Sequence, residues 1–526
     1  MTKIDIYDST LRDGAQAQGI SYSVEDKIKI VERLDELGIR YIEAGNPGSN
    51  PKDLEFFSRV GALELKNAKI IAFGSTRKVG VAVEYDGNVQ SLLLAGTRAV
   101  AIFGKCWDDQ VTGILRTTLD ENLSMIGDTI RFLKQKGLEV VFDAEHFFDG
   151  YKANSGYAMR TLGAAAEAGA DCLCLCDTNG GSFPEEVFEI TGIVAKRFDT
   201  AIGIHCHNDG ELAVSNSLVA VKAGATQVQG TINGIGERCG NANLCSIIPN
   251  LQLKLGFECI PPSNLERLTS LSNFVSETAN MAPNEKAAFV GKHAFSHKGG
   301  MHIDAVQKHP ASYEHIKPEL VGNSRTILMS EVAGRSTLLA RINAIDPTLN
   351  RDSPETRRVM DRLKQLEYEG YQFETAESSF ELVVRKILGK YTPFFDLKEF
   401  KVIANEPAAN GINSTAMIKI RVGELEEITA AEGDGPVNAL DMAMRKALER
   451  FYPAIRDIKL TDYKVRVLNS DAASAAKVRV LIESTDHLES WTTIGVSTDI
   501  INASWLALVD AVEYKLVRDQ ERLVRH

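Results

Sequence analysis

Long apolar runs and clusters of basic residues are both missing from this chain of 526 residues. No window reaches the roughly 18 apolar residues of a membrane-spanning helix, and the start, MTKIDIYDST, has no basic stretch followed by an apolar one. The 71 acidic residues exceed the 59 basic ones, giving a formal charge of −12, which disfavours a nucleic-acid partner. Proline is scarce, at 15 residues, which argues against disorder. We therefore expect a soluble, cytoplasmic protein of two to four domains with no membrane or nucleic-acid partner.

Paired cysteine spacings are missing as well. The eight cysteines do not form the short pairs of a zinc ribbon or a secreted disulfide framework. Three of them, Cys172, Cys174 and Cys176, alternate in the run DCLCLCD. Alternate residues of a strand share one face, so they are either soft metal ligands or small core side chains. We interpret them as core residues.

The first half of the chain alternates short β-branched or apolar runs with amphipathic helical patterns. Eight runs stand out: KIDIYDST, YIEAG, KIIAFGS, AVAIFGK, EVVFDAEH, DCLCLCDT, AIGIHCHN and QVQGTING. Eight strand–helix units in about 250 residues are typical of a (β/α)8 TIM barrel. The alternative is an open doubly wound sheet, which normally has fewer units and a glycine-rich turn after its first strand. Here that turn reads DSTLRDGAQ, so we predict the α/β barrel.

Polar residues gather where the predicted strands end, and in a TIM barrel those ends carry the chemistry. The histidines of IHCHND, His205 and His207, stand two residues apart, so both rings project from one face of a strand. The other candidates at these ends are Arg12, Asp13, Glu145, Thr178 and Asn241. Any one of them alone is equally well explained as a helix cap or loop residue. Together, two imidazoles, a carboxylate and an amide oxygen indicate a divalent-metal site with positions open to substrate.

Such a site suits chemistry on a 2-oxo acid. The keto and carboxylate oxygens of the acid can chelate the ion, which polarises the carbonyl carbon. Arg12, beside Asp13, is suited to stabilise a developing enolate or alkoxide. A general base is also required.

Three motifs carry a family resemblance: LRDGAQ followed by ten residues and Lys27, then IHCHND, then NGIGERCGNAN. They resemble those of the 2-isopropylmalate, homocitrate and citramalate synthases, members of the DRE-TIM metallolyase group. The resemblance covers nearly the whole chain, because AFSHKGGMHIDAV and the C-terminal region also resemble parts of these synthases. It implies a Claisen condensation of acetyl-CoA with a 2-oxo acid, then thioester hydrolysis, with Mn²⁺, Mg²⁺ or Zn²⁺ as cofactor.

The resemblance also implies a role for each matching residue. The metal ligands would be Asp13, His205, His207 and Asn241, the catalytic residues Arg12, Glu145, His302 and Tyr313, and the substrate-binding residues Arg12 and Thr178. One departure stands after His-Asn-Asp, where the family has an arbitrary residue and then glycine. Here Gly210 precedes Glu211, and we expect a one-residue adjustment of the turn into the next helix.

The loop YIEAGNPGSNPKD resembles the citramalate synthase branch, which acts on pyruvate in isoleucine biosynthesis. An apolar pocket distinguishes one methylene by only about 1–3 kcal/mol, so 2-isopropylmalate synthase, acting on 2-oxoisovalerate, stays the alternative. Homocitrate synthase and a carbon–carbon lyase similar to hydroxymethylglutaryl-CoA lyase are more distant alternatives.

The remaining chain is predicted to form two further parts. We expect the barrel over 1–275, linker subdomains with a helix pair and His302 over 276–388, and an α+β regulatory and dimerisation domain of the LeuA type over 389–526. Two segments starting at Pro436 and Ile500, 64 residues apart, share an alanine pattern and each follows strand-like runs, which predicts two βββα-like repeats. The resemblance implies that the C-terminal domain forms a homodimer and binds isoleucine as an effector. Dimerisation alone is the simpler interpretation of this domain.

Overall fold

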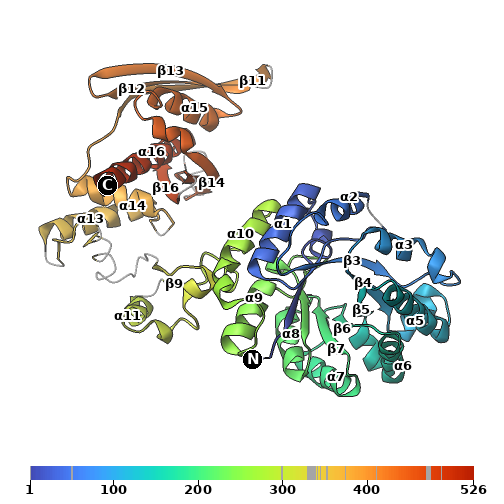
Figure 1. Cartoon of the computed structure of the whole chain (residues 1–526). Coiled ribbons are helices and arrows are strands. Elements are labelled where there is room, and N and C mark those ends of the chain that lie inside the picture. Colours follow the sequence, from blue (N-terminus) through green and yellow to red (C-terminus); the bar gives the residue numbers. More distant parts are fainter. Residues whose placement is uncertain are drawn as a thin grey trace. The chain divides into compact units, whose positions relative to one another are not determined.

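The computed structural model contains a closed barrel of eight parallel strands in the order β1 to β8, with β1 also pairing to β8 (Figure 1). Its strands are β1 (Asp5–Asp8), β2 (Tyr41–Glu43), β3 (Lys69–Ser75), β4 (Ala99–Lys105), β5 (Glu139–Glu145), β6 (Cys172–Asp177), β7 (Ala201–Cys206) and β8 (Gln227–Gly230). Each falls within one of the eight runs read from the sequence, so the prediction of a TIM barrel is confirmed.

The structure describes residues 2–48, 51–297, 300–327, 339, 342, 343, 345–350, 353–373, 375–409, 412–468, 476–486 and 489–525. They form two compact units, one of residues 1–296 and 309–326, the other of residues 297–308 and 327–526. The three-part division of the chain drawn above stays a prediction.

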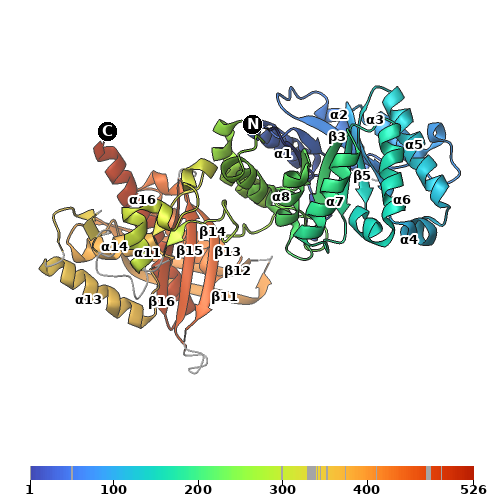
Figure 2. The same ribbon diagram turned by 90° about the horizontal axis from the view of Figure 1, so that it is seen from below.

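Helices surround the barrel (Figure 2). They are α1 (Val24–Leu37), α2 (Pro51–Val60), α3 (Gly87–Leu94), α4 (Asp108–Gln110), α5 (Leu119–Gln135), α6 (Phe147–Glu167), α7 (Pro184–Arg197), α8 (Ala213–Ala223) and α9 (Leu244–Pro249). Local signals set their ends: Ser23 and Asp26 form a capping box at the start of α1, and Gly38 ends it with a φ of 100°. None of the described helices is both long and apolar enough to cross a membrane.

The barrel has an apolar core on each side of its strands. Outward side chains pack beneath the helices. Inside, the three cysteines of β6 pack with Tyr7 and Tyr41, and all three are buried. Their position in the core is confirmed. Cys174 and Cys176 also lie close enough to Asp143 to share a metal ion with it.

After the barrel, the chain continues as α10 (Leu268–Thr278), which packs against α1. No ninth strand joins the barrel among the described residues. Two short 3-10 helices, η7 (Pro310–Ser312) and η8 (Pro318–Val321), belong to the same unit.

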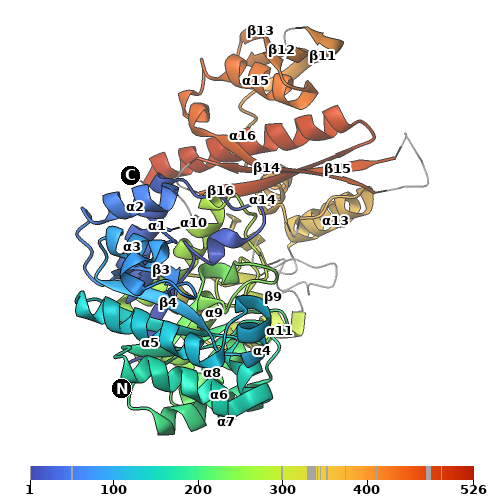
Figure 3. The same cartoon turned by 90° about the vertical axis from the view of Figure 1, so that its right-hand side faces the viewer.

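The second unit holds the predicted helix pair and repeats (Figure 3). Its helices are α11 (Gly300–Lys308), α13 (Pro354–Glu369), α14 (Glu377–Ile387), α15 (Pro436–Leu448) and α16 (Ile500–Arg525). One antiparallel sheet contains β11 (Asp396–Ala409), β12 (Ile412–Val422) and β13 (Leu425–Gly433), and a second contains β14 (Lys459–Val467), β15 (Val478–Thr485) and β16 (Ser490–Ser497).

Helix α15 packs on the first sheet and α16 on the second, so the two βββα repeats are confirmed. One hydrogen bond recurs in both repeats at the same spacing. The hydroxyl of Thr429 donates to the carbonyl oxygen of Ala443, and that of Thr493 donates to that of Ala507, each at 2.8 Å. Both alanines are fully buried. Their small side chains let each helix lie close to its sheet.

A partly buried ionic cluster joins α14 to α16. The Ser379 hydroxyl donates to Asp510 at 2.6 Å, and Lys386 Nζ lies 3.5 Å from Asp510 and 3.2 Å from Glu513. Burial raises the pKa of Asp510 to about 6, although Lys386 and Ser379 oppose that shift.

Candidate active site

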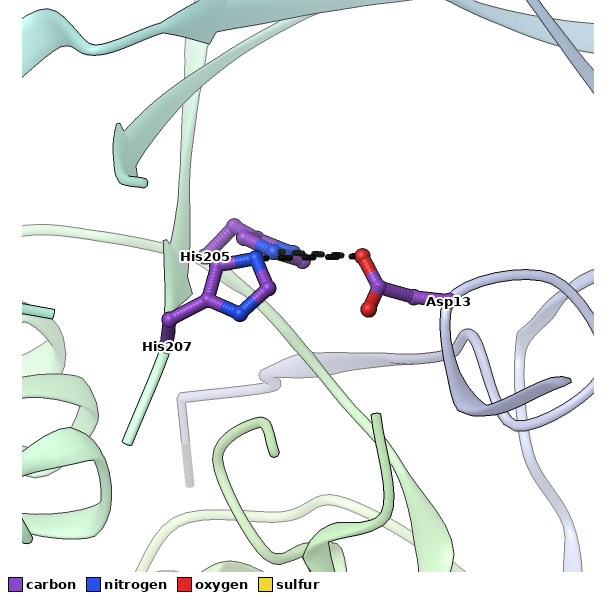
Figure 4. A group of neighbouring side chains, drawn as sticks. All are labelled: Asp13, His205 and His207. Carbon is purple, nitrogen blue, oxygen red and sulfur yellow. Dashed lines mark ion pairs between the residues drawn. The ribbon is translucent and has the colours of Figure 1, made fainter. Parts of the chain in front are cut away.

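Asp13, His205 and His207 converge at the mouth of the barrel, where the strands reach their carboxyl ends (Figure 4). Asp13 follows β1, His205 lies in β7, and His207 directly follows β7. The Nε2 atoms of both imidazoles lie 3.9 Å from Asp13 Oδ2. The ring centroids are 5.2 Å apart, and all three side chains are buried. The three groups can hold one metal ion between them.

Asn241 completes this group from the loop after β8. Its Nδ2 donates to Asp13 Oδ1 at 2.8 Å. Its Oδ1 is buried and has no hydrogen-bond partner among the described residues, and the same holds for His207 Nδ1. A buried acceptor without a partner is costly, so the vacant Asn241 oxygen fits a metal ligand.

The protonation states also suit a divalent cation. Burial lowers the pKa of His205, and burial together with His205 lowers the pKa of His207 to about 4. Burial alone would raise the pKa of Asp13, but Arg12 and the two imidazoles outweigh it and hold that pKa well below its usual range. At neutral pH the site therefore offers two neutral imidazoles and a carboxylate, the forms that bind metal.

Arg12 is fixed beside this group by a residue that the sequence reading did not single out. Its Nη1 donates to Asp13 Oδ2 at 2.8 Å, and its Nε donates to Glu43 Oε1. Glu43 ends β2, is fully buried, and also accepts from the hydroxyls of Tyr7 and Ser9, each at 2.6 Å. Glu43 belongs to the run YIEAG. The only signal for it in the sequence is an acid at the end of a predicted barrel strand.

Glu145 and Thr178 stand at the ends of β5 and β6. Lys105 Nζ, at the end of β4, lies 2.5 Å from Glu145 Oε2. Lys105 is a second residue that the sequence reading did not assign. The Thr178 hydroxyl oxygen accepts from the backbone N–H of His146 at 2.8 Å. The threonine hydroxyl keeps its own hydrogen to donate.

His302 and Tyr313 fall in different units. His302 lies on α11 of the second unit, whereas Tyr313 directly follows η7 of the first unit and is 48% exposed. Their proposed roles beside the barrel stay predictions.

The departure from the family pattern, Gly210 followed by Glu211, lies in the turn after β7. Glu211, not Gly210, has a positive φ, of 58°. The family glycine therefore corresponds to the position where the backbone is left-handed, and glutamate occupies it here at a conformational cost.

Comparison with known proteins identifies the family of the chain. The HMGL-like family model matches residues 3–275, the homocitrate synthase post-HMGL domain-like model residues 289–370, and the LeuA allosteric (dimerisation) domain model residues 374–516. The (R)-citramalate synthase of Aquifex aeolicus is 53% identical over 99% of both chains, and that of Geobacter sulfurreducens is 52% identical over the same shares. The chain belongs to the HMGL-like family, within its group of 2-isopropylmalate, homocitrate and citramalate synthases.

More distant relatives carry different names. At 30% identity, Methanocaldococcus jannaschii has a match named 2-isopropylmalate synthase, covering 99% of this chain and 96% of that protein, and another named (R)-citramalate synthase, covering 98% and 99%. The solved structure of a Bacillus subtilis HMG-CoA lyase is 20% identical, with a TM-score of 0.47, and covers 54% of this chain and 96% of that one.

Proposed function

We propose that this enzyme is a citramalate synthase, which condenses acetyl-CoA with pyruvate and hydrolyses the thioester to give citramalate and CoA. Five relatives named (R)-citramalate synthase are 42–53% identical over nearly their whole length. A relative named 2-isopropylmalate synthase is 30% identical, as is a further one named (R)-citramalate synthase. The observation that carries the chemistry is the convergence of Asp13, His205 and His207 beside Arg12.

We assign the metal to Asp13, His205, His207 and Asn241. When bound, a divalent ion such as Mn²⁺, Mg²⁺ or Zn²⁺ supplies Lewis-acid polarisation of the pyruvate carbonyl. The vacant Asn241 oxygen and the neutral imidazoles support this assignment.

The residues around the metal group divide the remaining work. Glu145, with His302, takes a proton from the methyl group of acetyl-CoA, and Tyr313 acts beside His302. Arg12 donates to the resulting enolate oxygen, and then to the alkoxide that forms when the methyl carbon bonds to the keto carbon. Thr178 donates its hydroxyl hydrogen to the pyruvate carboxylate. The base then returns its proton to the alkoxide. Water cleaves the thioester, with its hydroxyl bonding to the acyl carbon and its hydrogen going to the CoA sulfur.

A cavity of about 350 Å³ beside Arg12 suits the thioester end of acetyl-CoA. Lys27, Lys52 and Phe73 line it as well. Asp53 also lines the cavity and pairs with Lys27 at 2.5 Å, so Lys52 supplies the positive charge that favours the phosphates of CoA. Phe73 stacks against Arg12, with the guanidinium carbon 3.9 Å from the ring centroid.

The LeuA-type domain is proposed to join two copies of the chain and to bind isoleucine as an effector in the cytoplasm, where the enzyme serves isoleucine biosynthesis. Isoleucine should inhibit the full chain, and light scattering should report a dimer. Inhibition by leucine in its place would contradict the assigned pathway.

The deciding experiment measures thiol release from acetyl-CoA with pyruvate or 2-oxoisovalerate, before and after treatment with EDTA. We expect pyruvate to be preferred, EDTA to abolish the reaction, and Mn²⁺ or Mg²⁺ to restore it. His207→Ala should be inactive, whereas His293→Ala, which removes a partly exposed histidine of the same unit, should be fully active. A preference for 2-oxoisovalerate would favour 2-isopropylmalate synthase, and indifference to EDTA would exclude the metal chemistry.

A further inference from the structure

We infer that Gln229 and Asp143 form a hydrogen-bonded relay that fixes the tautomer of the metal ligand His205, so both are positioning residues for the metal centre. This inference rests on the proposed function, because it takes His205 as a ligand.

The relay links side chains of three barrel strands: His205 of β7, Gln229 of β8 and Asp143 of β5. His205 Nδ1 lies 3.1 Å from Gln229 Oε1, and Gln229 Nε2 donates to Asp143 Oδ1 at 2.9 Å. His205 on β7 and Gln229 on β8 are direct partners in the parallel pairing of these strands, so the strand register itself sets the first contact.

The chemistry of the amide fixes the hydrogen. An amide oxygen only accepts, so it favours the imidazole form that carries hydrogen on Nδ1. The lone pair of His205 then sits on Nε2, which faces Asp13. A metal ligand needs that lone pair.

Asp143 sets which way the amide of Gln229 points. If the amide were reversed, its NH₂ group would face His205 Nδ1 and would favour hydrogen on Nε2, the form that cannot bind a metal there. The carboxylate accepts from NH₂ and repels the amide oxygen, so it opposes this reversal. Burial raises the pKa of Asp143 to about 7, with Glu43 adding to the shift, so the carboxylate form that opposes the reversal is the one present above that pH.

Burial leaves the relay little competition from solvent. Gln229 is 0%, Asp143 4% and His205 6% exposed. The second imidazole has no such arrangement, because His207 Nδ1 finds no hydrogen-bond partner among the described residues. The relay therefore predicts an effect specific to His205.

The test measures binding of Mn²⁺ alone to the full chain by titration calorimetry. Gln229→Met keeps the side-chain volume but removes both polar atoms, and it should weaken Mn²⁺ affinity about 10–100-fold, the range for lost support of a ligand histidine. The matched control is Gln227→Met, the same change two residues earlier on the same face of β8. Gln227 is buried and contacts Cys172 instead of a ligand, so this control should bind Mn²⁺ like the parent protein.

Asp143 supplies a second, independent pair of variants. Asp143→Asn offers both an acceptor and an NH₂ donor, so it no longer opposes the reversed amide of Gln229 and should weaken Mn²⁺ binding part of the way, whereas Asp143→Leu removes the contact and should lose more affinity. Nitrogen-15 NMR of histidine-labelled, metal-free protein should show His205 with hydrogen on Nδ1 in the parent and lose that signal in Gln229→Met.

The outcomes separate the two proposals. If the parent protein binds no Mn²⁺, the proposed metal site is wrong. If the parent binds and both Gln229→Met and Asp143→Leu bind equally well, the site stands and the relay is wrong. If Gln229→Met fails to fold by circular dichroism, the Asp143 pair and the tautomer signal of the parent still decide.

Discussion

Replacing Glu43 with glutamine tests whether this buried acid holds Arg12 in place. Glu43 accepts three hydrogen bonds, from Tyr7, Ser9 and Arg12. Glutamine offers one oxygen and an NH₂ group, so at least one donor loses its partner and the negative charge opposite the guanidinium is lost. Asp13 still pairs with Arg12.

The magnitude follows from these contacts. A hydrogen bond to a charged group contributes about 1.5–3 kcal/mol, and removing one partner of a buried ion pair costs about 3–5 kcal/mol. Since Asp13 remains, we expect Glu43→Gln to cost about 3 kcal/mol, which lowers the Tm of the barrel by about 6–12 °C. Loss of the Nε contact also lets Arg12 shift, and a 1 Å misplacement costs about 100-fold in rate.

The assay is calorimetric unfolding together with kcat/KM for thiol release. Glu139→Gln is the matched control. This acid begins β5 and also accepts a hydrogen bond from a tyrosine, Tyr41, at 2.6 Å. Its ion pair with Lys69 is more exposed, with 24% of the Glu139 side chain and 35% of the Lys69 side chain accessible. We expect the control to cost less than about 1 kcal/mol and to leave kcat/KM unchanged, because it stands away from the mouth. Equal Tm and kcat/KM values for Glu43→Gln and the parent would refute the reasoning.

Three further substitutions give distinct outcomes. Gly236→Ala should abolish Mn²⁺ binding measured by calorimetry, because an added Cβ would lie 2.1 Å from Asn241 Nδ2 and 3.2 Å from Asp13 Oδ1; retained affinity would contradict it. Glu211→Gly should raise the free energy of unfolding by up to about 1 kcal/mol in urea, because glycine accepts the positive φ without strain, and a loss of stability would show that the glutamate makes a compensating contact. Asp510→Asn should remove a pH dependence of the second unit. The pKa of Asp510 is about 6 in the folded protein and about 3.9 in an unfolded chain. The stability that its protonated form contributes is therefore fully present below pH 3.9 and is lost as the pH rises through 6. That loss is about 2–3 kcal/mol by linkage, and unfolding measured from pH 4 to 7 should show a flatter profile for the variant.

The barrel could be predicted because its strands are buried on both faces. Runs such as AVAIFGK and DCLCLCDT are nearly all apolar, and each is followed by a helical pattern with its own end signals. The repeats could be predicted because their alanines recur at a fixed spacing, which the matching bonds from Thr429 and Thr493 now explain.

The site was only partly visible in the sequence. His205 and His207 stand out because a strand puts alternate rings on one face, and their approach to Asp13 follows from the barrel. Glu43 and Gln229 gave no comparable signal, because a polar residue at a strand end looks the same whether it faces solvent or a buried guanidinium. Glu43 reaches Arg12 from the neighbouring strand, and Gln229 of β8 reaches Asp143 of β5, 86 positions away, so both contacts depend on the assembled barrel.

The bond between Asn241 and Asp13 joins residues 228 positions apart, across the seam where the last strand meets the first. A half-built barrel of β1 to β4 therefore carries only one of the four donors, Asp13, and no fragment that stops before β8 can assemble the full set. Any cation held there must stabilise the closed ring over every open intermediate, so its concentration in the cell would govern how long the finished enzyme survives as well as how fast it works.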